Sequence, residues 1–252
     1  MYLSTGWNLA GRSAVITADY RGWTPFLASA LAEAGADLVI VGSAESDMMD
    51  AAKAARNYGT TVVPVVTDIT IEDSILTMLD CVRNRFNRID ILVNNALLEF
   101  AKPFDKVTSA EWETVMEFNV FSRFLLCRLI GKHMLEQGGG RIINIESGLS
   151  VRGMRNAVAA CASQGAIHQM TSALALEWAN DNIRVNGIGS GWISTSKPSV
   201  NDDESLLTRY IPSKRRGHPN DLCGLLVYLG SDACDFLTGQ TLFIDGGVLA
   251  HA

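Results

Sequence analysis

Two polar residues placed just after expected strands are the best candidates for chemistry. Residues 141–145 (RIINI) form a short β-branched run, typical of a buried parallel strand, and Glu146 and Ser147 follow it. Glu99 lies shortly after a second such run, residues 89–93. Because ligands bind outside the carboxyl ends of strands in α/β sheets, we expect Ser147 and Glu99 to face a ligand pocket.

The helix that follows Ser147 is expected from about residue 156, and three of its residues are spaced four apart. Ala160, Gln164 and His168 therefore share one helical face. An isolated histidine on an apolar helix is more often a packed core residue than a catalytic one, so we favour packing for His168. Strand alternation turns Glu146 away from the face that Ser147 uses.

A few loop residues also lie close to the expected pocket. Tyr20 is in the first loop and could supply a phenol. Arg152 and Arg155 follow Ser147 in a loop, where they would either bind an anionic substrate or face solvent, and we favour solvent.

Nucleophilic hydrolysis and metal catalysis find no support in the residue spacing. Ser147 is not part of the G-x-S-x-G pattern of a hydrolase nucleophile. Cys161 lies between alanines without an adjacent base, so we expect it to pack. The four histidines lack the spacing of metal ligands, at positions 133, 168, 218 and 251.

Strand-like and helix-like segments alternate along the chain. Strands are expected at residues 13–17, 37–41, 61–66, 89–93, 141–145, 183–188 and 241–244. Helices are expected at residues 24–34, 44–58, 72–86, 109–137 with Ser109 as its cap, 156–179 and 219–229, with a small mobile excursion at 201–210. This alternation predicts a three-layer, Rossmann-type α/β fold: a doubly wound parallel sheet of about seven strands, in one domain spanning residues 1–252.

Composition narrows the possible partners and the compartment. The chain has 252 residues and a net charge of −6, which disfavours nucleic acid and anionic membranes as partners. Its five cysteines are odd in number and show no C-x-x-C spacing, as expected for free thiols in a reducing cytoplasm. We expect neither a signal peptide nor a membrane span, and therefore a cytoplasmic protein. We expect its partner to be a small molecule.

Over nearly its whole length the chain resembles the short-chain dehydrogenase/reductase family. In that family a serine at the end of a strand is followed thirteen residues later by a tyrosine, which begins a Tyr-x-x-x-Lys motif. The serine corresponds to Ser147, and Ala162-Ser163 match the family's register. Ala160 then stands at the tyrosine position and Gln164 at the lysine position. The resemblance implies an oxidoreductase frame with a degenerate active site.

The family's chemistry assigns roles to the matching positions. Its tyrosine donates a proton to the carbonyl oxygen, its lysine lowers the tyrosine pKa, and its serine polarises the carbonyl. A helix asparagine holds a water relay, and Asn119 matches it. Ala160 carries no acid, and uncharged Gln164 cannot depress a neighbour's pKa. We therefore expect Ser147, Asn119 and Glu99 as the catalytic residues.

The first loop, residues 17–24 (TADYRGWT), keeps only one of the three glycines of the family's nucleotide motif, Gly22. Such glycines let the backbone approach a pyrophosphate at a helix N-terminus. Thr24 before Pro25 predicts a helix that begins at Pro25, and Trp23 adds bulk where a cofactor would lie. The loop either still binds a dinucleotide, more weakly, or has lost it.

Other cofactor positions of the family are better matched. Asp68 resembles the aspartate that contacts adenine, although it would equally cap a turn. Asn94 and Ala96 fit the family's Asn-Asn-Ala-Gly with Leu97 in place of glycine, although Asn94 would equally tie two strands together. The resemblance implies cofactor contacts at Thr17, Tyr20, Arg21, Gly22, Trp23, Ser43, Asp68, Ile69, Asn94, Ala96, Gln164, Ile193 and Thr195.

The choice between NAD and NADP depends on the end of the second expected strand. Gly42 and Ser43 stand there, without the acid that would bind a ribose 2′-hydroxyl. Arg21 would instead meet a 2′-phosphate. If a dinucleotide binds, NADP is favoured over NAD, and no metal is expected.

Two long helices exceed what one sheet face can cover. In the resembling family the helices that match residues 111–137 and 156–179 pair across a two-fold axis, and the C-terminal strand builds a second interface. We therefore predict a homotetramer or, failing that, a dimer.

Three functions remain open. We favour non-redox chemistry of the lyase, isomerase or dehydratase kind, on a small carbonyl or hydroxy compound. A catalytically inactive ligand-binding or partner subunit is the second hypothesis. The third is an NADP(H)-dependent oxidoreductase with a relocated proton donor.

Overall fold

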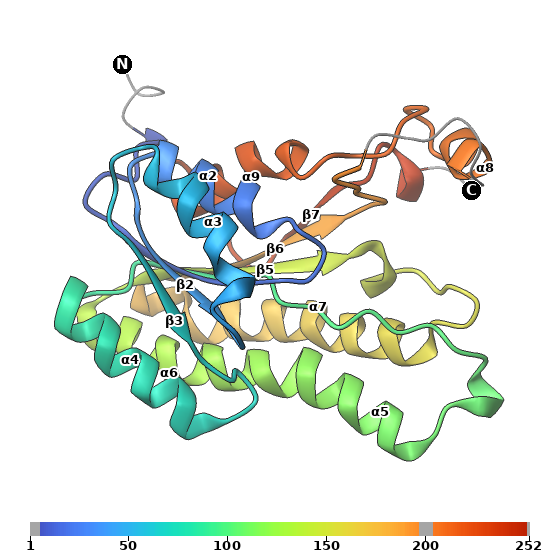
Figure 1. Ribbon diagram of the computed structural model, residues 1–252, viewed down its shortest axis with the longest axis horizontal. Helices are drawn as coiled ribbons and strands as arrows, with labels where there is room; N and C mark the ends of the chain where they lie inside the picture. Colours follow the sequence, from blue (N-terminus) through green and yellow to red (C-terminus); the bar gives the residue numbers. More distant parts are fainter. Residues whose placement is uncertain (1–5, 197–203, 251–252) are drawn as a thin grey trace.

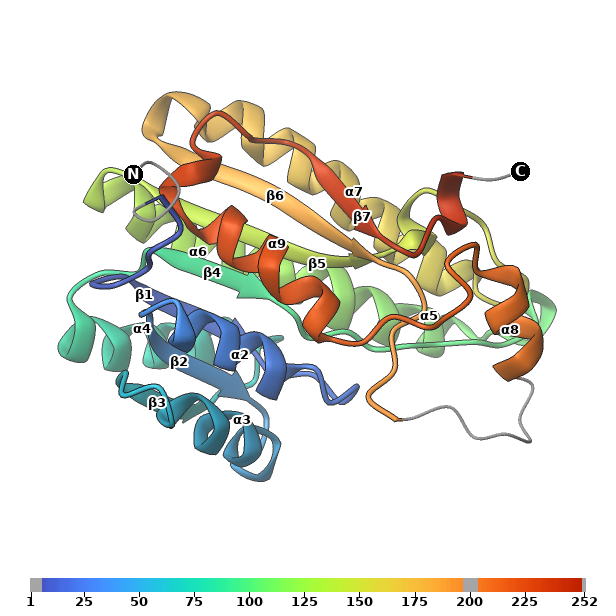
Figure 2. The same ribbon diagram turned by 90° about the horizontal axis from the view of Figure 1, so that it is seen from above.

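Seven parallel strands form one sheet in the computed structural model, which describes residues 6–196 and 204–250. The strands are β1 (Ser13–Thr17), β2 (Asp37–Gly42), β3 (Val62–Val66), β4 (Ile91–Asn94), β5 (Gly140–Ser147), β6 (Ile183–Ser190) and β7 (Thr241–Ile244). They lie in the order β3-β2-β1-β4-β5-β6-β7 (Figure 2). The direction of winding reverses between β1 and β4, which opens a crevice at the carboxyl ends of the strands.

Helices cover both faces of this sheet (Figure 1). One face carries α2 (Thr24–Glu33), α3 (Ser46–Arg56) and α9 (Asn220–Gly230). The other carries α4 (Glu72–Phe86), α5 (Ser109–Met116), α6 (Ser122–Gln137) and α7 (Val158–Trp178). A short helix, α8 (Glu204–Tyr210), lies beyond the sheet, and 3₁₀ turns span Phe104–Lys106, Gly148–Ser150, Ala179–Asp181, Asp232–Cys234 and Val248–Ala250.

The apolar strands are buried on both faces because their residues alternate between the two helix layers. In β1, Ala14 and Ile16 pack with the layer of α2, α3 and α9, while Val15 packs with the layer of α4, α6 and α7. Full burial of an aliphatic side chain contributes about 1.5–3 kcal/mol, so continuous apolar runs stabilise a sheet covered on both sides. The three-layer α/β prediction is confirmed.

The long helix expected at residues 109–137 is interrupted. Thr108, and not Ser109, caps α5, through a capping box with Glu111. A π-helical turn, Glu117–Phe121, then separates α5 from α6. The buried Asn119 lies in this turn, and such turns occur frequently at functional sites.

The prediction that α2 begins at Pro25 with Thr24 as its cap is wrong. The helix begins at Thr24, and the residue before it, Trp23, makes no side-chain capping bond. The N–H groups of Trp23 and Thr24 are instead satisfied by the carboxylate of Asp19 in the preceding loop. A carboxylate is a stronger acceptor than a hydroxyl and also complements the positive end of the helix dipole.

Most other boundaries differ from expectation by one or two residues, as helix and strand ends usually do. The excursion expected at 201–210 lies partly outside the described residues, and its described part is α8. Among the helices of the described residues, none has the length and apolar character needed to cross a membrane.

Candidate functional site

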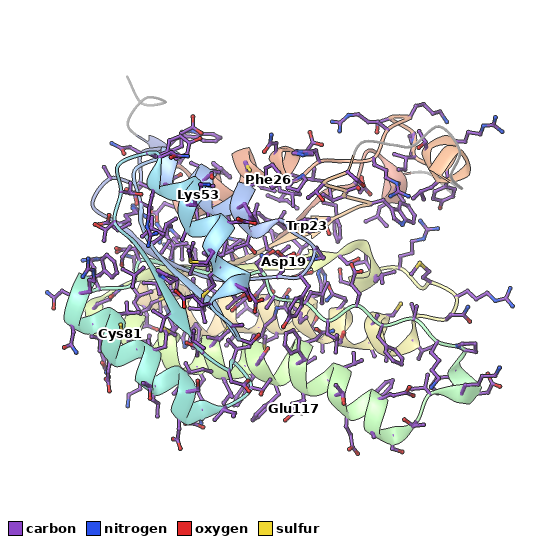
Figure 3. All side chains as sticks on the ribbon, viewed as in Figure 1. Asp19, Trp23, Phe26, Lys53, Cys81 and Glu117 are labelled. Carbon is purple, nitrogen blue, oxygen red and sulfur yellow. The ribbon has the colours of Figure 1, made fainter. Side chains whose placement is uncertain are left out.

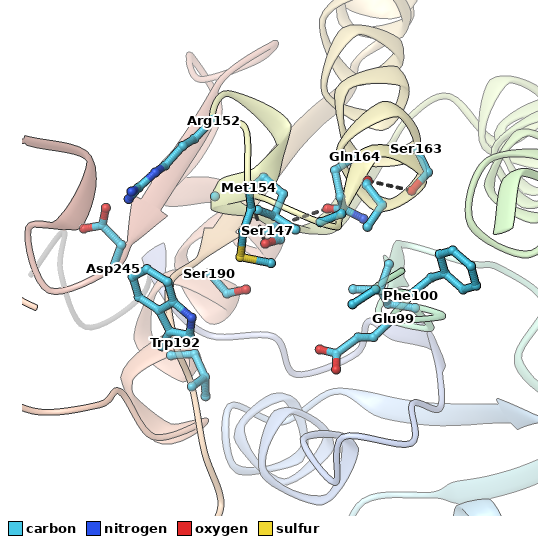
Figure 4. Close-up of a pocket in the computed structure, with 18 of the residues that line it drawn as sticks. Glu99, Phe100, Ser147, Arg152, Met154, Ser163, Gln164, Ser190, Trp192 and Asp245 are labelled. Carbon is cyan, nitrogen blue, oxygen red and sulfur yellow. Dashed lines mark hydrogen bonds between the residues drawn. The ribbon is translucent and has the colours of Figure 1, made fainter. Parts of the chain in front are cut away.

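A cavity of about 560 Å³ opens at the carboxyl ends of β5 and β6 (Figure 4). Ser147 and Ser190, the last residues of these strands, form part of its wall, and α7 supplies Ala160 and Gln164. The segment after β4 supplies Glu99 from the opposite side. The structure thus brings together Ser147, Gln164 and Glu99, as the sequence predicted for this edge of the sheet.

Ser147 and Gln164 are joined by a hydrogen bond through their peptide and amide groups. The backbone N–H of Ser147 donates to Gln164 Oε1 at 2.7 Å, which fixes the orientation of the amide. The Ser147 Oγ accepts from Leu149 N at 3.3 Å, so its proton is available to another acceptor. Gln164 is 1% exposed, and its Nε2 has no hydrogen-bond partner among the described residues. A buried amide donor without a partner is costly, so this group points to a ligand.

Ala160 lines the cavity thirteen residues after Ser147, where its methyl group can neither donate nor accept a proton. Among the described residues that form this wall there is neither a tyrosine nor a lysine. The acid–base capacity of the cavity therefore depends on other groups.

Asn119 lines the cavity, but the protein already uses its polar atoms. Its Oδ1 accepts from Leu98 N at 2.8 Å, and its Nδ2 donates to Leu98 O at 3.0 Å and to Ser163 Oγ at 3.1 Å. These bonds anchor the backbone beside Glu99 and join it to α7. The expected catalytic role of Asn119 remains a prediction, and its observed role is to position this segment.

Glu146 and His168 lie together beneath the cavity. The Glu146 carboxylate is fully buried and accepts from Thr171 and Thr241 at 3.1 Å each. His168 Nδ1 lies 3.0 Å from its Oε2. Neither residue lines the cavity, which agrees with the expectation that Glu146 turns away from it and that His168 packs.

Arg152 lines the cavity and Arg155 does not. Arg152 Nη2 donates to Tyr210 Oη at 2.5 Å, and its guanidinium lies 5.2 Å from the centre of the same ring. Arg155 is exposed. One of the two arginines is therefore placed to meet an anionic group in the cavity.

A second cleft, of about 200 Å³, lies at the carboxyl ends of β1, β2 and β3. Six of the residues expected to contact a cofactor line it: Thr17, Tyr20, Ser43, Asp68, Ile69 and Ala96. The Tyr20 hydroxyl lies 3.2 Å from Ser43 Oγ. Asp68 Oδ1 accepts from Thr70 N at 2.9 Å, so this aspartate closes a turn as well as facing the cleft. The cleft lies at the carboxyl ends of the strands, where α/β sheets of this kind bind the adenosine end of a dinucleotide.

Asp47 also lines this cleft and was missed by the sequence analysis. Its carboxylate accepts from Ser43 Oγ at 3.0 Å and from Ala44 N at 3.1 Å. It lies in the first turn of α3, slightly beyond the end of β2 where an acid was sought. A carboxylate there suits ribose hydroxyls and repels a 2′-phosphate.

Four other expected cofactor residues lie elsewhere. Asn94 is buried and donates to Asn144 Oδ1 at 2.8 Å, so it ties β4 to β5 and lines neither cleft. Ile193 lines the larger cavity, but Thr195 does not. Gly22 has a φ of 76°, which glycine adopts without strain.

Arg21 and Trp23 line the larger cavity and not the smaller cleft. Arg21 Nε donates to Asp19 Oδ2 at 2.8 Å, and its guanidinium lies 3.7 Å from the centre of the Trp23 ring. Burial lowers the pKa of Arg21 from its ordinary value, while the adjacent Asp19 opposes that change. Because Arg21 does not line the smaller cleft, the structure does not support the expectation that it meets a 2′-phosphate there.

The two clefts lie side by side at the edge of the sheet where folds of this kind bind a nicotinamide dinucleotide. The adenosine end fits the cleft that contains Asp47 and Asp68, and the nicotinamide end fits the larger cavity beside Ser147. Asp19 lines the smaller cleft and Arg21 lines the larger cavity, so the part of the dinucleotide that joins its two ends would pass this pair. The residues that line the two clefts therefore fit the two ends of the dinucleotide. Between these ends, where its pyrophosphate would lie, the chain places the carboxylate of Asp19.

Comparison with known proteins agrees with this reading of the fold. A family model described as enoyl-(acyl carrier protein) reductase matches residues 18–249. The chain is 36% identical to the 2-dehydro-3-deoxy-D-gluconate 5-dehydrogenase of Bacillus subtilis, covering 99% of both chains. It is 32% identical to the 5-keto-D-gluconate 5-reductase of Escherichia coli, covering 96% of this chain and 97% of the relative.

A solved structure is similar over the same length. It is a gluconate 5-dehydrogenase from Burkholderia cenocepacia in complex with NADP and tartrate, with a TM-score of 0.91 and 33% identity. The similarity covers 98% of each chain. Because these relatives are named dehydrogenases and reductases, the preference for lyase, isomerase or dehydratase chemistry is wrong.

Proposed function

Because the chain belongs to the short-chain dehydrogenase/reductase family, we propose that it interconverts a hydroxyl and a carbonyl group on a small polyhydroxy acid. A nicotinamide dinucleotide is the hydride carrier in this proposal. The names of the relatives support the reaction class, and the two adjoining clefts supply room for the carrier and the substrate.

One observation carries the proposal: Ser147 and Gln164 line the same cavity, and the buried Gln164 Nε2 has no hydrogen-bond partner among the described residues. Among the described residues there is no acceptor for the Ser147 hydroxyl proton or for either proton of Gln164 Nε2. Two convergent donors bind a carbonyl oxygen and stabilise it more strongly when it becomes an alkoxide. We assign Gln164 this role, at the position where the family has a lysine.

We assign each group in the cavity a role in the reaction. The bound dinucleotide would supply or accept the hydride. Ser147 and Gln164 hold the substrate oxygen and stabilise the negative charge that develops on it. Glu99 faces the same cavity and is exposed, so it exchanges protons with solvent and relays one to or from that oxygen. In this proposal the enzyme works without the family's tyrosine, at a cost in rate.

Arg152 supports an acidic substrate. Its guanidinium lies on the cavity wall, and a planar guanidinium matches a carboxylate with two parallel hydrogen bonds. A hydroxy acid would then bind between Arg152 and the Ser147–Gln164 pair, with its carboxylate at one end and its reacting carbon at the other.

Asp47 supports NAD as the preferred carrier. Its carboxylate stands in the cleft assigned to the adenosine end, where it would accept from ribose hydroxyls. An added 2′-phosphate would meet this negative charge. Asp47→Asn is therefore expected to raise kcat/KM with NADP relative to NAD, and an unchanged ratio would contradict this assignment.

The proposed function is tested by dinucleotide-dependent turnover. Purified protein is assayed for oxidation of D-gluconate and 2-dehydro-3-deoxy-D-gluconate and for reduction of 5-keto-D-gluconate, with NAD(H) and NADP(H). We expect turnover of at least one hydroxy or keto acid, and a decrease of about 10²-fold in kcat for Ser147→Ala. If no such acid turns over with either carrier, the proposal is refuted.

A further inference from the structure

The carboxylate of Asp19 occupies the N-terminal end of α2. Its side chain is fully buried, in the loop between β1 and α2 where Figure 3 labels Asp19 and Trp23. Asp19 Oδ1 accepts from Trp23 N and Thr24 N at 3.2 Å each and from Thr24 Oγ1 at 2.8 Å. These two N–H groups are the first that the helix offers to an anion.

Arg21 closes the other side of this arrangement. It pairs with Asp19 Oδ2, and its Nη2 donates to Asn95 O at 2.9 Å and Asn95 Oδ1 at 3.2 Å. The Trp23 ring, only 4% exposed, packs against the guanidinium. We call Asp19, Arg21, Trp23 and Thr24 the Asp19 cluster. Its charges are balanced and its hydrogen bonds satisfied without any ligand.

In this fold the pyrophosphate of a dinucleotide binds at the N-terminus of the first helix after β1. Asp19 already fills that position, between the cleft assigned to adenosine and the cavity assigned to the nicotinamide end. A carboxylate and a pyrophosphate cannot share the same N–H donors, and their charges repel at this distance. One anion must therefore leave before the other binds.

We propose that Asp19 is an internal substitute for the pyrophosphate, and that a dinucleotide binds by exchanging with it. This inference rests on the proposed function, because it presumes that a dinucleotide is the natural ligand. On exchange the pyrophosphate accepts from the α2 N–H groups and pairs with Arg21, while Asp19 moves to solvent. The closed cluster cancels the affinity that phosphate groups normally add, so the free protein holds adenosine and ADP with similar strength.

Calorimetric titration with adenosine and ADP tests the exchange without turnover. For the wild-type protein we expect dissociation constants for the two probes that agree within about threefold. Asp19→Asn keeps the side-chain shape but removes the charge, so ADP binding should strengthen at least about tenfold while adenosine binding is unchanged. Asp50→Asn, which removes an exposed carboxylate on α3, is the charge-matched control and should change neither constant.

Tryptophan fluorescence of the unmodified chain gives a second readout, which does not require the Asp19→Asn variant to fold. ADP should change the emission, because Arg21 leaves the Trp23 ring, and adenosine should not. The change should be absent in Trp23→Phe.

The outcomes separate this inference from the proposed function. If wild-type protein binds ADP at least tenfold more tightly than adenosine and Asp19→Asn changes nothing, the exchange is refuted while dinucleotide-dependent turnover still stands. If neither protein binds adenosine, ADP or NADH up to millimolar concentration, the dinucleotide role fails and this inference fails with it.

Discussion

Replacing Gln164 by glutamate changes one atom at the centre of the proposed site. The variant Gln164→Glu keeps an oxygen that accepts from Ser147 N, so Ser147 stays in place. It replaces Nε2, the unpartnered donor, by a second oxygen. The variant therefore removes the donor to the substrate oxygen with little change in shape.

The expected effect follows from the burial of this group. Loss of one preorganised donor to a developing oxyanion lowers kcat by about 10²–10³-fold. The introduced carboxylate would also repel the alkoxide. Burial raises the pKa of a carboxyl group, and its protonated form regains an O–H donor. Activity should therefore recover as the pH falls through the pKa of the introduced carboxyl group and be lost as the pH rises.

The assay is the pH profile of kcat for the wild-type protein and the variant with the best substrate found. Gln169→Glu is the matched control, because Gln169 is exposed on the same helix and should keep the wild-type profile. If Gln164→Glu keeps wild-type kcat across the range, the amide does not contact the reacting oxygen and the assignment fails. A uniform loss at every pH would assign Gln164 a purely structural role.

Three other predictions concern the site, the segment beside it and the oligomeric state. The double variant Ala160→Tyr/Gln164→Lys restores a phenol and an ammonium, and kcat should rise about 10²–10⁴-fold; no gain would mean that the cavity already supplies its own acid. Asn119→Ala leaves Leu98 unpaired, and urea unfolding should show a loss of about 1–3 kcal/mol; a smaller change would mean that Asn119 does not anchor this segment. We also propose that the chain is a homotetramer, for which light scattering should give four times the chain mass of 27.3 kDa, and a monomer would contradict it.

The sheet could be predicted because its residues carry the signal directly. Residues 13–17 form a strand at the expected bounds, since apolar side chains buried on both faces allow little else. Residues 241–244 also match, although this strand is only partly buried. The break at Asn119 could not be predicted. A π-helical turn depends on contacts with Leu98 and Ser163, which are distant in sequence.

The sequence predicted which edge of the sheet holds the site, but it did not predict the side-chain contacts within the site. Topology alone brings three of its residues together: Ser147 at the end of β5, Glu99 after β4, and Gln164 on α7. Asp19 was missed because the Thr24-Pro25 pair is itself a strong helix start and concealed a better cap five residues earlier. The signal was present, since an acidic residue ahead of a helix N-terminus is a capping group in its own right. Arg21 was misplaced for the same reason, because its partner is Asp19.

Hydride transfer from a labelled carrier tests the central claim most directly. The reduced carrier, NADH or NADPH with deuterium at both C4 positions of the nicotinamide ring, is incubated with 5-keto-D-gluconate and the protein, and the product is analysed by mass spectrometry. The account predicts one deuterium on the former carbonyl carbon, at a rate that falls in Ser147→Ala. Product that forms without the label, or substrate that remains unchanged with both carriers, would contradict it.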